Sequence, residues 1–218
     1  MCGSTPAARA TTDNPLVIDL DATEILSHSD KEHATRTWKK HFGFHPLAAI
    51  IDHGDGLTGE PAAVLLRPGN AGSNTAADGH EWDTRLLVRT DAAGGSQSFL
   101  NHLNDQGLAY SIGFPVTWQI GEIASTLGDP VKQGIIRVEH PASGAQLRIT
   151  DVDGRRVQAF VTNRPGHANR LDVLHRGRGR CEQRIRDLKD CGLGKLPHEG
   201  FRMNHLAPSS RTLSSLQS

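Results

Sequence analysis

Four short apolar runs separated by turn-forming residues dominate the first half of the chain. They cover residues 15–23, 46–52, 62–67 and 85–91 and are rich in Val, Ile, Leu and Ala. The β-branched residues in these runs favour strands. The short connections between successive strands predict an antiparallel meander for the first three, with residues 27–41 as a polar loop or short excursion.

The second half of the pattern mixes helices with further strands. Ser96 is a good N-cap for a helix to about Leu103. Residues 108–114 predict a strand, and residues 120–127 a short helix. Residues 145–152 and 155–162 predict a hairpin whose tight turn is Asp153-Gly154.

The last periodic segment, His175 to Lys189, predicts one amphipathic helix. At about 100° per residue, Cys181, Ile185 and Leu188 share one stripe with Leu174. The neighbouring stripe carries a single carboxylate among cations: His175, Arg178, Glu182, Arg186 and Lys189. Such a carboxylate suits a place where a metal ion meets a phosphate backbone. The alternative is an exposed helix with i,i+4 ion pairs such as Glu182 to Arg186.

Composition gives no global attraction to nucleic acid, since 24 Lys and Arg balance 24 Asp and Glu. The charge is uneven, because the segment from Arg164 to Lys189 holds eight cations and three acids, a basic patch of the kind that contacts phosphates. The three cysteines lack a paired metal spacing, and no long apolar run or signal peptide is present. We therefore expect a cytoplasmic protein with reduced thiols and no membrane contact.

Acidic residues at three places in this pattern are candidates for metal binding. Asp19 and Asp21 point to the same face of the first strand, because side chains alternate. The alternative is that this face is wet, or that Asp21 caps a turn. Asp91 ends the fourth strand before a Gly-rich turn, where open α/β sheets bind ligands, although an acid there can also simply initiate a helix. With Glu182, these carboxylates would suit Mg²⁺ or Mn²⁺.

Several runs around these acids together resemble a known protein family. The chain resembles the DDE transposases of bacterial insertion sequences, most closely the group called the thirteen-eighty family. The matching runs are residues 18–23, 42–47, 65–78, 88–91 and 180–186, of which 65–78 is the most specific. Related transposases carry a Tyr, Arg, Glu, Lys signature, and here Arg178, Glu182 and Lys189 occupy its gaps, with His175 in place of Tyr.

The resemblance implies a ribonuclease-H-like α/β fold: a mixed sheet with three antiparallel strands first, flanking helices and the catalytic Glu on a late helix. By it, the catalytic and metal-binding acids are Asp21, Asp91 and Glu182, with Asp19 as the alternative first acid. His175, Arg178, Arg186 and Lys189 would contact DNA.

The resemblance also implies Mg²⁺ or Mn²⁺ as cofactor, transposon-end and target DNA as partners, association with the nucleoid, and homo-oligomers as a further arrangement. We expect a leader over residues 1–14 that is disordered, a shortened catalytic domain over 15–197 and a poorly structured tail over 198–218. Family members have an N-terminal DNA-binding region that this chain lacks, so the sequence predicts a truncated copy. Its function would be metal-dependent strand cleavage and transfer, with a non-catalytic DNA-binding remnant or a non-transposing metal nuclease as alternatives.

Overall fold

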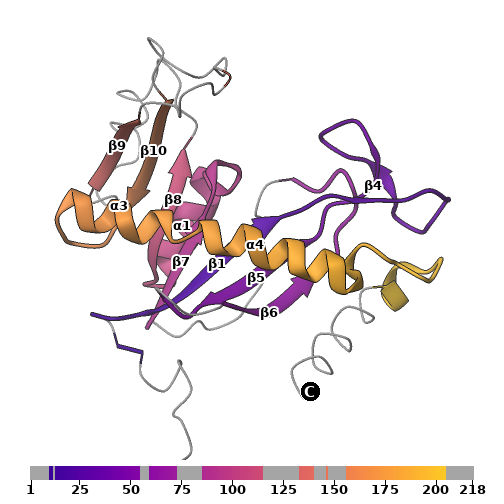
Figure 1. The fold of residues 1–218 in the computed structure, drawn as a ribbon, viewed down its shortest axis with the longest axis horizontal. Helices are drawn as coiled ribbons and strands as arrows, with labels where there is room; N and C mark the ends of the chain where they lie inside the picture. Colours follow the sequence, from indigo (N-terminus) through magenta and orange to yellow (C-terminus); the bar gives the residue numbers. More distant parts are fainter. Residues whose placement is uncertain are drawn as a thin grey trace, which may run out of the picture. The chain divides into compact units, whose positions relative to one another are not determined.

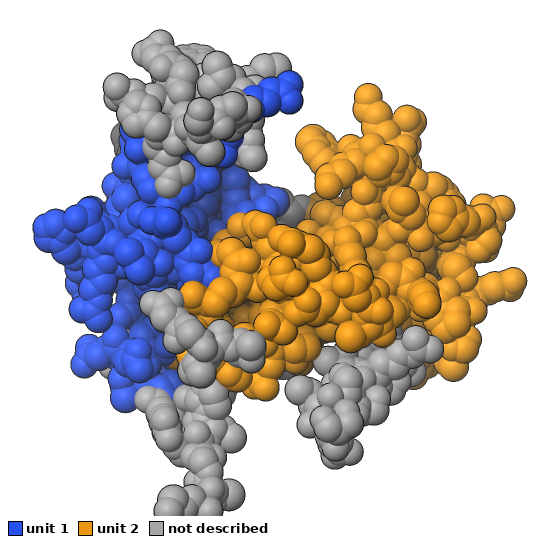
Figure 2. All heavy atoms as spheres, viewed as in Figure 1, with its two compact units in different colours: residues 1–15, 76–177 blue, residues 16–75, 178–218 orange. Residues whose placement is uncertain are grey.

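The structure, a computed structural model, describes residues 10–11, 13–54, 59–72, 85–114, 133–139, 146 and 156–204. The chain forms two compact units, coloured in Figure 2. Unit 1 contains residues 1–15 and 76–177, and unit 2 contains residues 16–75 and 178–218. Both units combine strands with helices, which confirms an α/β architecture, and each is described by itself.

The antiparallel meander predicted for the first three long strands is confirmed in unit 2. Strand β1 (Leu16–Ala22) pairs with β5 (Leu47–Asp52), and β5 pairs with β6 (Glu60–Leu65). Asp19 lies opposite Ile50 and Asp21 opposite Ala48. Both acids therefore sit on the same face of β1, as alternation of side chains predicts.

The polar excursion between β1 and β5 carries a small sheet that the sequence did not predict. Its strands β2 (Ile25–Leu26), β4 (Phe42–Phe44) and β3 (Thr35–Arg36) are antiparallel in that order. The strands are only two or three residues long, which is too short for a period-2 pattern to mark them. An apolar cluster of Ile25, Phe44, Leu66, Leu193 and Leu196 lies beneath them.

The single helix predicted from His175 to Lys189 is wrong, because the chain forms two helices here. Helix α3 (Ala168–Arg176) ends at Gly177, and α4 (Gly179–Leu188) begins after Arg178 (Figure 1). Gly177 and Gly179 flank the break, and each glycine costs a helix interior roughly 1 kcal/mol relative to alanine. The predicted stripe is therefore divided, with His175 in unit 1 and Arg178 in unit 2.

Helix α4 buries the apolar side that its sequence predicted. Cys181 and Ile185 are buried against Ala48 and Ile50 of β5, and Leu188 packs at the same cluster. This contact orients α4 in unit 2, so that its opposite side carries the charged residues. A π-helical turn, Lys189–Leu193, continues α4 and is kinked at Gly192, whose φ of 105° suits only glycine well.

Unit 1 is built on four strands in the order β7-β8-β10-β9. Strand β7 (Leu86–Thr90) is parallel to β8 (Ala109–Phe114), and the connection between them contains α1 (Gln97–Asp105). Strand β10 (Arg156–Thr162) is antiparallel to both β8 and β9 (Gln133–Glu139). The sheet of unit 1 is thus mixed, and a helix joins its parallel pair, as such a pair requires.

Helix α1 begins where the sequence indicated. Ser96 is its N-cap, and the Ser96 hydroxyl accepts a hydrogen bond from the Phe99 amide at 3.3 Å. Phe99, Leu100 and Leu103 are buried on one side of the helix. The amphipathic pattern and the cap thus agree in setting both the start and the buried face of α1.

Several predicted elements lie outside the described residues. They are the helix at 120–127, most of the segment 145–152 with the Asp153-Gly154 turn, most of the leader and the end of the tail. The predicted hairpin of 145–152 with 155–162 is wrong for its described strand, because β10 pairs with β9 along its whole length and with β8 over Ala159–Thr162. Residues 198–204 are described: Asn204 is fully buried and bonds to the backbone of His198. No helix within the described ranges is long and apolar enough to cross a membrane.

Candidate functional site

In unit 2, one guanidinium group contacts two of the predicted acids. The Nη2 atom of Arg178 lies 3.2 Å from Oδ2 of Asp21, and its Nη1 atom lies 3.9 Å from Oε1 of Glu182. Arg178 and Asp21 are mostly buried, whereas the Glu182 side chain is 56% exposed. The structure therefore brings Asp21 and Glu182 together around a shared cation.

The break between the two late helices explains how Arg178 reaches both acids. Arg178 is the N-cap residue of α4, and Glu182 lies one turn later on the same helix. Asp21 lies near the carboxyl end of β1, on the sheet against which α4 packs. The alternative of i,i+4 ion pairs is realised between Arg178 and Glu182 instead of between Glu182 and Arg186. Arg186 instead donates to Oε1 of Gln183 at 3.2 Å.

Asp19 and Asp21 differ sharply in exposure although they share a face. Asp19 is fully buried, opposite Ile50. Asp21 retains 14% of its side-chain exposure. The wet-face alternative therefore does not hold for Asp19. Of the two acids, only Asp21 keeps side-chain surface open to solvent.

Lys189, the last predicted DNA contact, is affected by the charge of Asp21 and of other residues of unit 2. Partial burial of its ammonium group and the charge of Lys39 lower the pKa of Lys189, while Glu24 and Asp21 oppose the shift. The residue as a whole remains exposed. Lys189 is therefore placed to meet an anion beside Asp21.

The donor chemistry of this cluster fits a divalent cation. Asp21 and Glu182 supply carboxylate oxygens, which Mg²⁺ and Mn²⁺ prefer, and both already attract the positive charge of Arg178. No group of three or more His, Cys, Asp or Glu side chains arranged for a metal ion occurs among the described residues. Two of the predicted metal ligands thus lie together in unit 2, and Asp91 belongs to unit 1.

Asp91 occupies the position that the sequence predicted, directly after β7. Its Oδ1 atom accepts a hydrogen bond from the Ala93 amide at 3.0 Å and caps a short 3-10 turn, Ala92–Gly94. Helix initiation, the alternative for this acid, is therefore realised locally. Close packing fixes the backbone, because a Cβ atom at Gly113 would lie 3.0 Å from the carbonyl carbon of Asp91.

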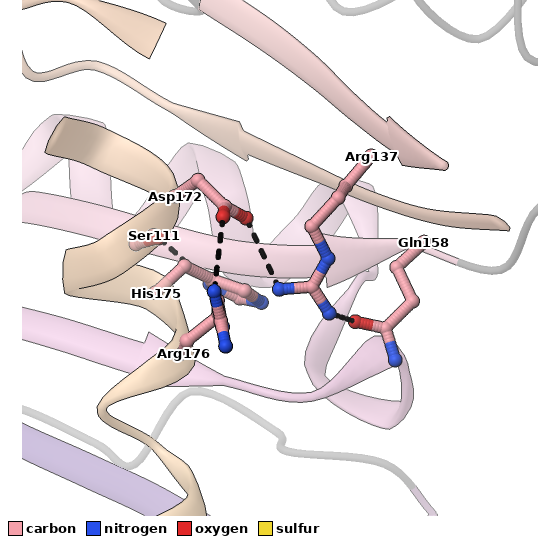
Figure 3. Close-up of polar contacts among 6 residues, drawn as sticks. All are labelled: Ser111, Arg137, Gln158, Asp172, His175 and Arg176. Atoms are coloured by element: carbon pink, nitrogen blue, oxygen red, sulfur yellow. Dashed lines mark hydrogen bonds and ion pairs between the residues drawn. The ribbon is translucent and has the colours of Figure 1, made fainter. Parts of the chain in front are cut away.

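His175 is held inside unit 1 by two contacts. Its ring stacks on Phe160 with a centroid separation of 4.2 Å and an interplanar angle of 3°. Its Nδ1 atom lies 2.8 Å from the hydroxyl of Ser111 (Figure 3). These contacts fix the plane of the His175 ring.

A second polar network lies beside His175 on α3. Asp172 contacts Arg137 at 3.3 Å and Arg176 at 3.9 Å, and Arg137 also bonds to Gln158 (Figure 3). These contacts tie α3 to strands β9 and β10. Arg137 and Arg176 are therefore partly neutralised by a structural carboxylate.

Other cations of the predicted basic patch also have structural partners. Arg180 makes a bidentate pair with the buried Asp52, through Nε at 2.9 Å and Nη2 at 2.8 Å. Arg184 pairs with Asp187 at 2.8 Å. The excess of cations between Arg164 and Lys189 therefore overstates the positive charge that α4 offers to a ligand, because the count ignores which side of α4 each cation occupies.

Sequence reasoning missed the role of Glu24, three residues after Asp21. Glu24 bonds to the hydroxyl of Thr37, and its Oε2 atom lies 3.0 Å from Nδ1 of His41. Burial opposes the shift, but these hydrogen bonds and the charge of His41 lower the pKa of Glu24. The closeness of Glu24 to the candidate catalytic acid Asp21 in the sequence could have indicated a role for it. The pattern did not reveal its partners Thr37 and His41, because they lie 13 and 17 residues further along the chain.

The loop after β6 is fixed by the buried Arg67. Its Nε atom donates to the His45 carbonyl at 3.0 Å, and Nη1 donates to that of Gly72 at 3.3 Å. The His45 ring in turn lies 3.3 Å from the Ala71 carbonyl. Arg67 thus fixes the conformation of the first part of the run 65–78, the most specific of the matching runs.

Comparison with known proteins supports one family. None of the curated proteins compared with the chain matches it. The family model described as transposase DDE domain group 1 matches residues 4–134, more than half of the 218-residue chain. The matched span includes Asp21 and Asp91 and ends before Glu182. The chain therefore belongs to the transposase DDE domain family, group 1.

Proposed function

We propose that this chain is the catalytic domain of a transposase that cleaves and joins DNA strands with the help of divalent metal ions. The observation that carries the proposal is the contact of Asp21 and Glu182 with one guanidinium group, that of Arg178. Two acids far apart in sequence gain nothing from proximity unless a cation lies between them. Membership of a DDE transposase family supplies the chemistry for which such acids are used.

In this proposal the predicted site residues have two kinds of task, metal binding and DNA binding. Asp21, Asp91 and Glu182 hold Mg²⁺ or Mn²⁺, with Asp19 as the alternative to Asp21. Held there, such ions would supply charge stabilisation at the phosphodiester and activation of the attacking hydroxyl. Arg178 and Lys189 attract phosphates to the side of Asp21, Arg186 adds positive charge on the exposed side of α4, and His175 contributes a fixed ring in unit 1.

Metal binding by the full chain is the first test. We expect Mn²⁺ binding, followed by calorimetry or electron paramagnetic resonance, to weaken in Asp21→Asn, Asp91→Asn and Glu182→Gln. Glu199→Gln is the matched control, because it neutralises an exposed glutamate outside the cluster. Equal Mn²⁺ affinity in all four variants and the parent would overturn the metal assignment.

Strand cleavage is the second test. Incubation with supercoiled plasmid and Mn²⁺ should produce nicked circles, and Glu182→Gln should abolish them while the circular dichroism spectrum is unchanged. Joined strands among the products identify a transposase, and free ends alone identify a nuclease. Cleavage by folded Glu182→Gln at the parent rate would remove Glu182 from the catalytic set.

A second candidate function is a DNA-binding remnant without catalysis. It is favoured by the fact that Arg178 already neutralises Asp21 and Glu182, as a permanent structural ion pair would. Persistent DNA binding in chelator, with no cleavage in Mn²⁺, would support the remnant. Loss of that binding at raised salt is expected for either candidate, because phosphate contacts dominate.

The finer assignment rests on the sequence runs that resemble the thirteen-eighty family. We propose that residues 15–197 form a shortened catalytic domain of that group and that DNA at the nucleoid is the partner. Complementation offers a direct test: this chain, expressed with a family member whose own three catalytic acids are replaced, should restore transposition only if Asp21, Asp91 and Glu182 are functional. Failure with every metal tested would favour the remnant.

A further inference from the structure

The turn between β3 and β4 presents a tryptophan to solvent. Trp38 is 91% exposed, the largest exposed fraction among the exposed large apolar side chains of the described residues. A single exposed apolar residue is ordinary on a protein surface. Its surroundings decide whether Trp38 has a partner.

The turn that carries Trp38 is held in one shape by its own hydrogen bonds. The Lys40 amide donates to the Thr37 carbonyl at 2.9 Å, and the His41 amide donates to the Thr37 hydroxyl at 3.2 Å. Thr37 itself is buried. The indole is therefore presented on a supported turn, which reduces the entropy lost when a partner binds.

Glu24 anchors this turn from below. It contacts the side chains of Thr37 and His41, which flank the exposed tip at either end. Glu24 lies three residues after Asp21 in unit 2. The turn is thereby connected to the strand that supplies the first candidate acid.

The tip is basic on both sides of the indole. Arg36, Lys39, Lys40 and His41 are all exposed. Lys40 has a φ of 67°, in the left-handed region that favours glycine or asparagine. Lys40 thus carries an exposed positive charge on a backbone conformation that disfavours lysine.

Lys39 also links the tip electrostatically to the acid cluster. After burial, the charge of Lys39 is the next cause that lowers the pKa of Lys189. Lys189 in turn responds to the charges of Glu24 and Asp21. Lys39 at the tip therefore acts electrostatically on Lys189, one of the candidate phosphate contacts.

We propose that Trp38 stacks on an unpaired DNA base while Lys39 and Lys40 bind the phosphates that flank it. An aromatic face between cations fits single-stranded nucleic acid, because every base has a π-face and every linkage a negative charge. The inference rests on the proposed function, in which DNA is the substrate. Glu24 acts as a positioning residue, since it holds the turn and does not meet the base.

The test compares two DNA probes that differ only in an unpaired end. One is a blunt duplex, and the other is the same duplex with a short single-stranded overhang that carries 2-aminopurine. With the full chain, Trp38→Ala should weaken binding to the overhang probe about tenfold and leave the duplex affinity and its salt dependence unchanged. Trp38→Phe should retain most of the binding, and Val173→Ala, an exposed apolar control on α3, should change neither affinity.

Quenching of the 2-aminopurine emission gives a second readout of stacking. The parent chain should quench it, and Trp38→Ala should not. Lys39→Ala should lower the salt dependence of binding to both probes by about one unit of slope. Lys40→Gly should raise the thermal midpoint yet weaken binding to both probes, which a purely structural lysine would not do.

The outcomes separate this inference from the proposed function. Failure of the parent chain to bind either probe overturns both. Normal duplex binding, with overhang affinity and quenching unaffected by Trp38→Ala, overturns the stacking alone. Self-association of the parent that disappears in Trp38→Ala, with overhang binding unchanged, would assign Trp38 to a protein contact and also overturn it. If Glu24→Gln weakens overhang binding, and the addition of Trp38→Ala weakens it no further, the positioning role of Glu24 is confirmed.

Discussion

Arg178 lies 3.2 Å from Asp21, and this pair joins the start of the late helix α4 to the first strand of unit 2. The same guanidinium reaches Glu182 one turn along the helix. A metal ion that uses the two carboxylates must share them with Arg178 or displace it. Competition between a resident guanidinium and an incoming cation is therefore built into the cluster.

Removal of the guanidinium should make metal binding tighter and DNA binding weaker. We expect Arg178→Met to raise Mn²⁺ affinity roughly two- to tenfold, the worth of one partly exposed ion pair. Calorimetric titration of Mn²⁺ measures the change. Arg186→Met is the control, because Arg186 bonds to Gln183 and to neither acid. Weaker Mn²⁺ binding in Arg178→Met would show that Arg178 organises the carboxylates for the metal.

Loss of the Arg180–Asp52 pair should be costly for stability. Asp52 is 3% exposed at its side chain and accepts two hydrogen bonds from the Arg180 guanidinium. Arg180→Met leaves that carboxylate buried, so unfolding free energy should fall by roughly 3 kcal/mol. Arg184→Met removes a pair that is more exposed on the acid side and should cost at most about 1 kcal/mol. Urea denaturation measures both losses of unfolding free energy, and equal losses for Arg180→Met and Arg184→Met would contradict this distinction.

Gly94 should tolerate no side chain. A Cβ atom there would lie 2.1 Å from the hydroxyl oxygen of Thr90, which is itself fully buried. Gly94→Ala should therefore destabilise unit 1 by roughly 1–3 kcal/mol, because Thr90 or the turn after Asp91 must move. Gly179→Ala is the matched control, since its Cβ meets nothing within 4 Å in α4. It should stabilise the chain by about 0.5–1 kcal/mol, and thermal unfolding measures both.

Stability should fall in acid partly through Glu24. The folded state lowers the pKa of Glu24 below its ordinary value of 4.5, through bonds from Thr37 and His41 that outweigh burial. The resulting stabilisation is complete above that value and is lost as the pH falls through the folded-state pKa. Glu24→Gln should flatten the dependence of unfolding free energy on pH below about pH 5. Thr37→Val removes one donor and should give an intermediate slope; a Glu24→Gln slope equal to that of the parent would contradict the assignment.

His175 and Ser111 should behave as a coupled pair. His175→Phe keeps an aromatic ring against Phe160 but leaves the buried Ser111 hydroxyl without this partner. The cost should be about 1–3 kcal/mol, and much of it should disappear when Ser111→Ala is added. A double-mutant cycle in urea measures the coupling. Additive effects of the two substitutions would show that the hydrogen bond contributes nothing.

Local pattern was a good guide to the long strands and to α1. The runs around Leu20, Ile50 and Val88 became β1, β5 and β7, and Ser96 capped α1, because burial and capping depend on residues close in sequence. The prediction of a single helix from His175 to Lys189 was wrong. It relied on the helical period of the apolar residues and gave too little weight to the two glycines beside Arg178. The small sheet of β2, β3 and β4 was missed, since strands of two or three residues carry no periodic signal.

The sequence by itself determined the candidate acids, the meander that carries the first of them and the family resemblance. It could do so because alternation, helical period and short motifs are properties of neighbouring residues. Only the tertiary structure decided that Arg178 joins Asp21 to Glu182, that Arg180 is committed to Asp52, and that Glu24 holds the turn of Trp38. These partners are set by the packing of α4 on β5 and by the course of the chain through β2, β3 and β4. Distance along the chain therefore gave no guide to them.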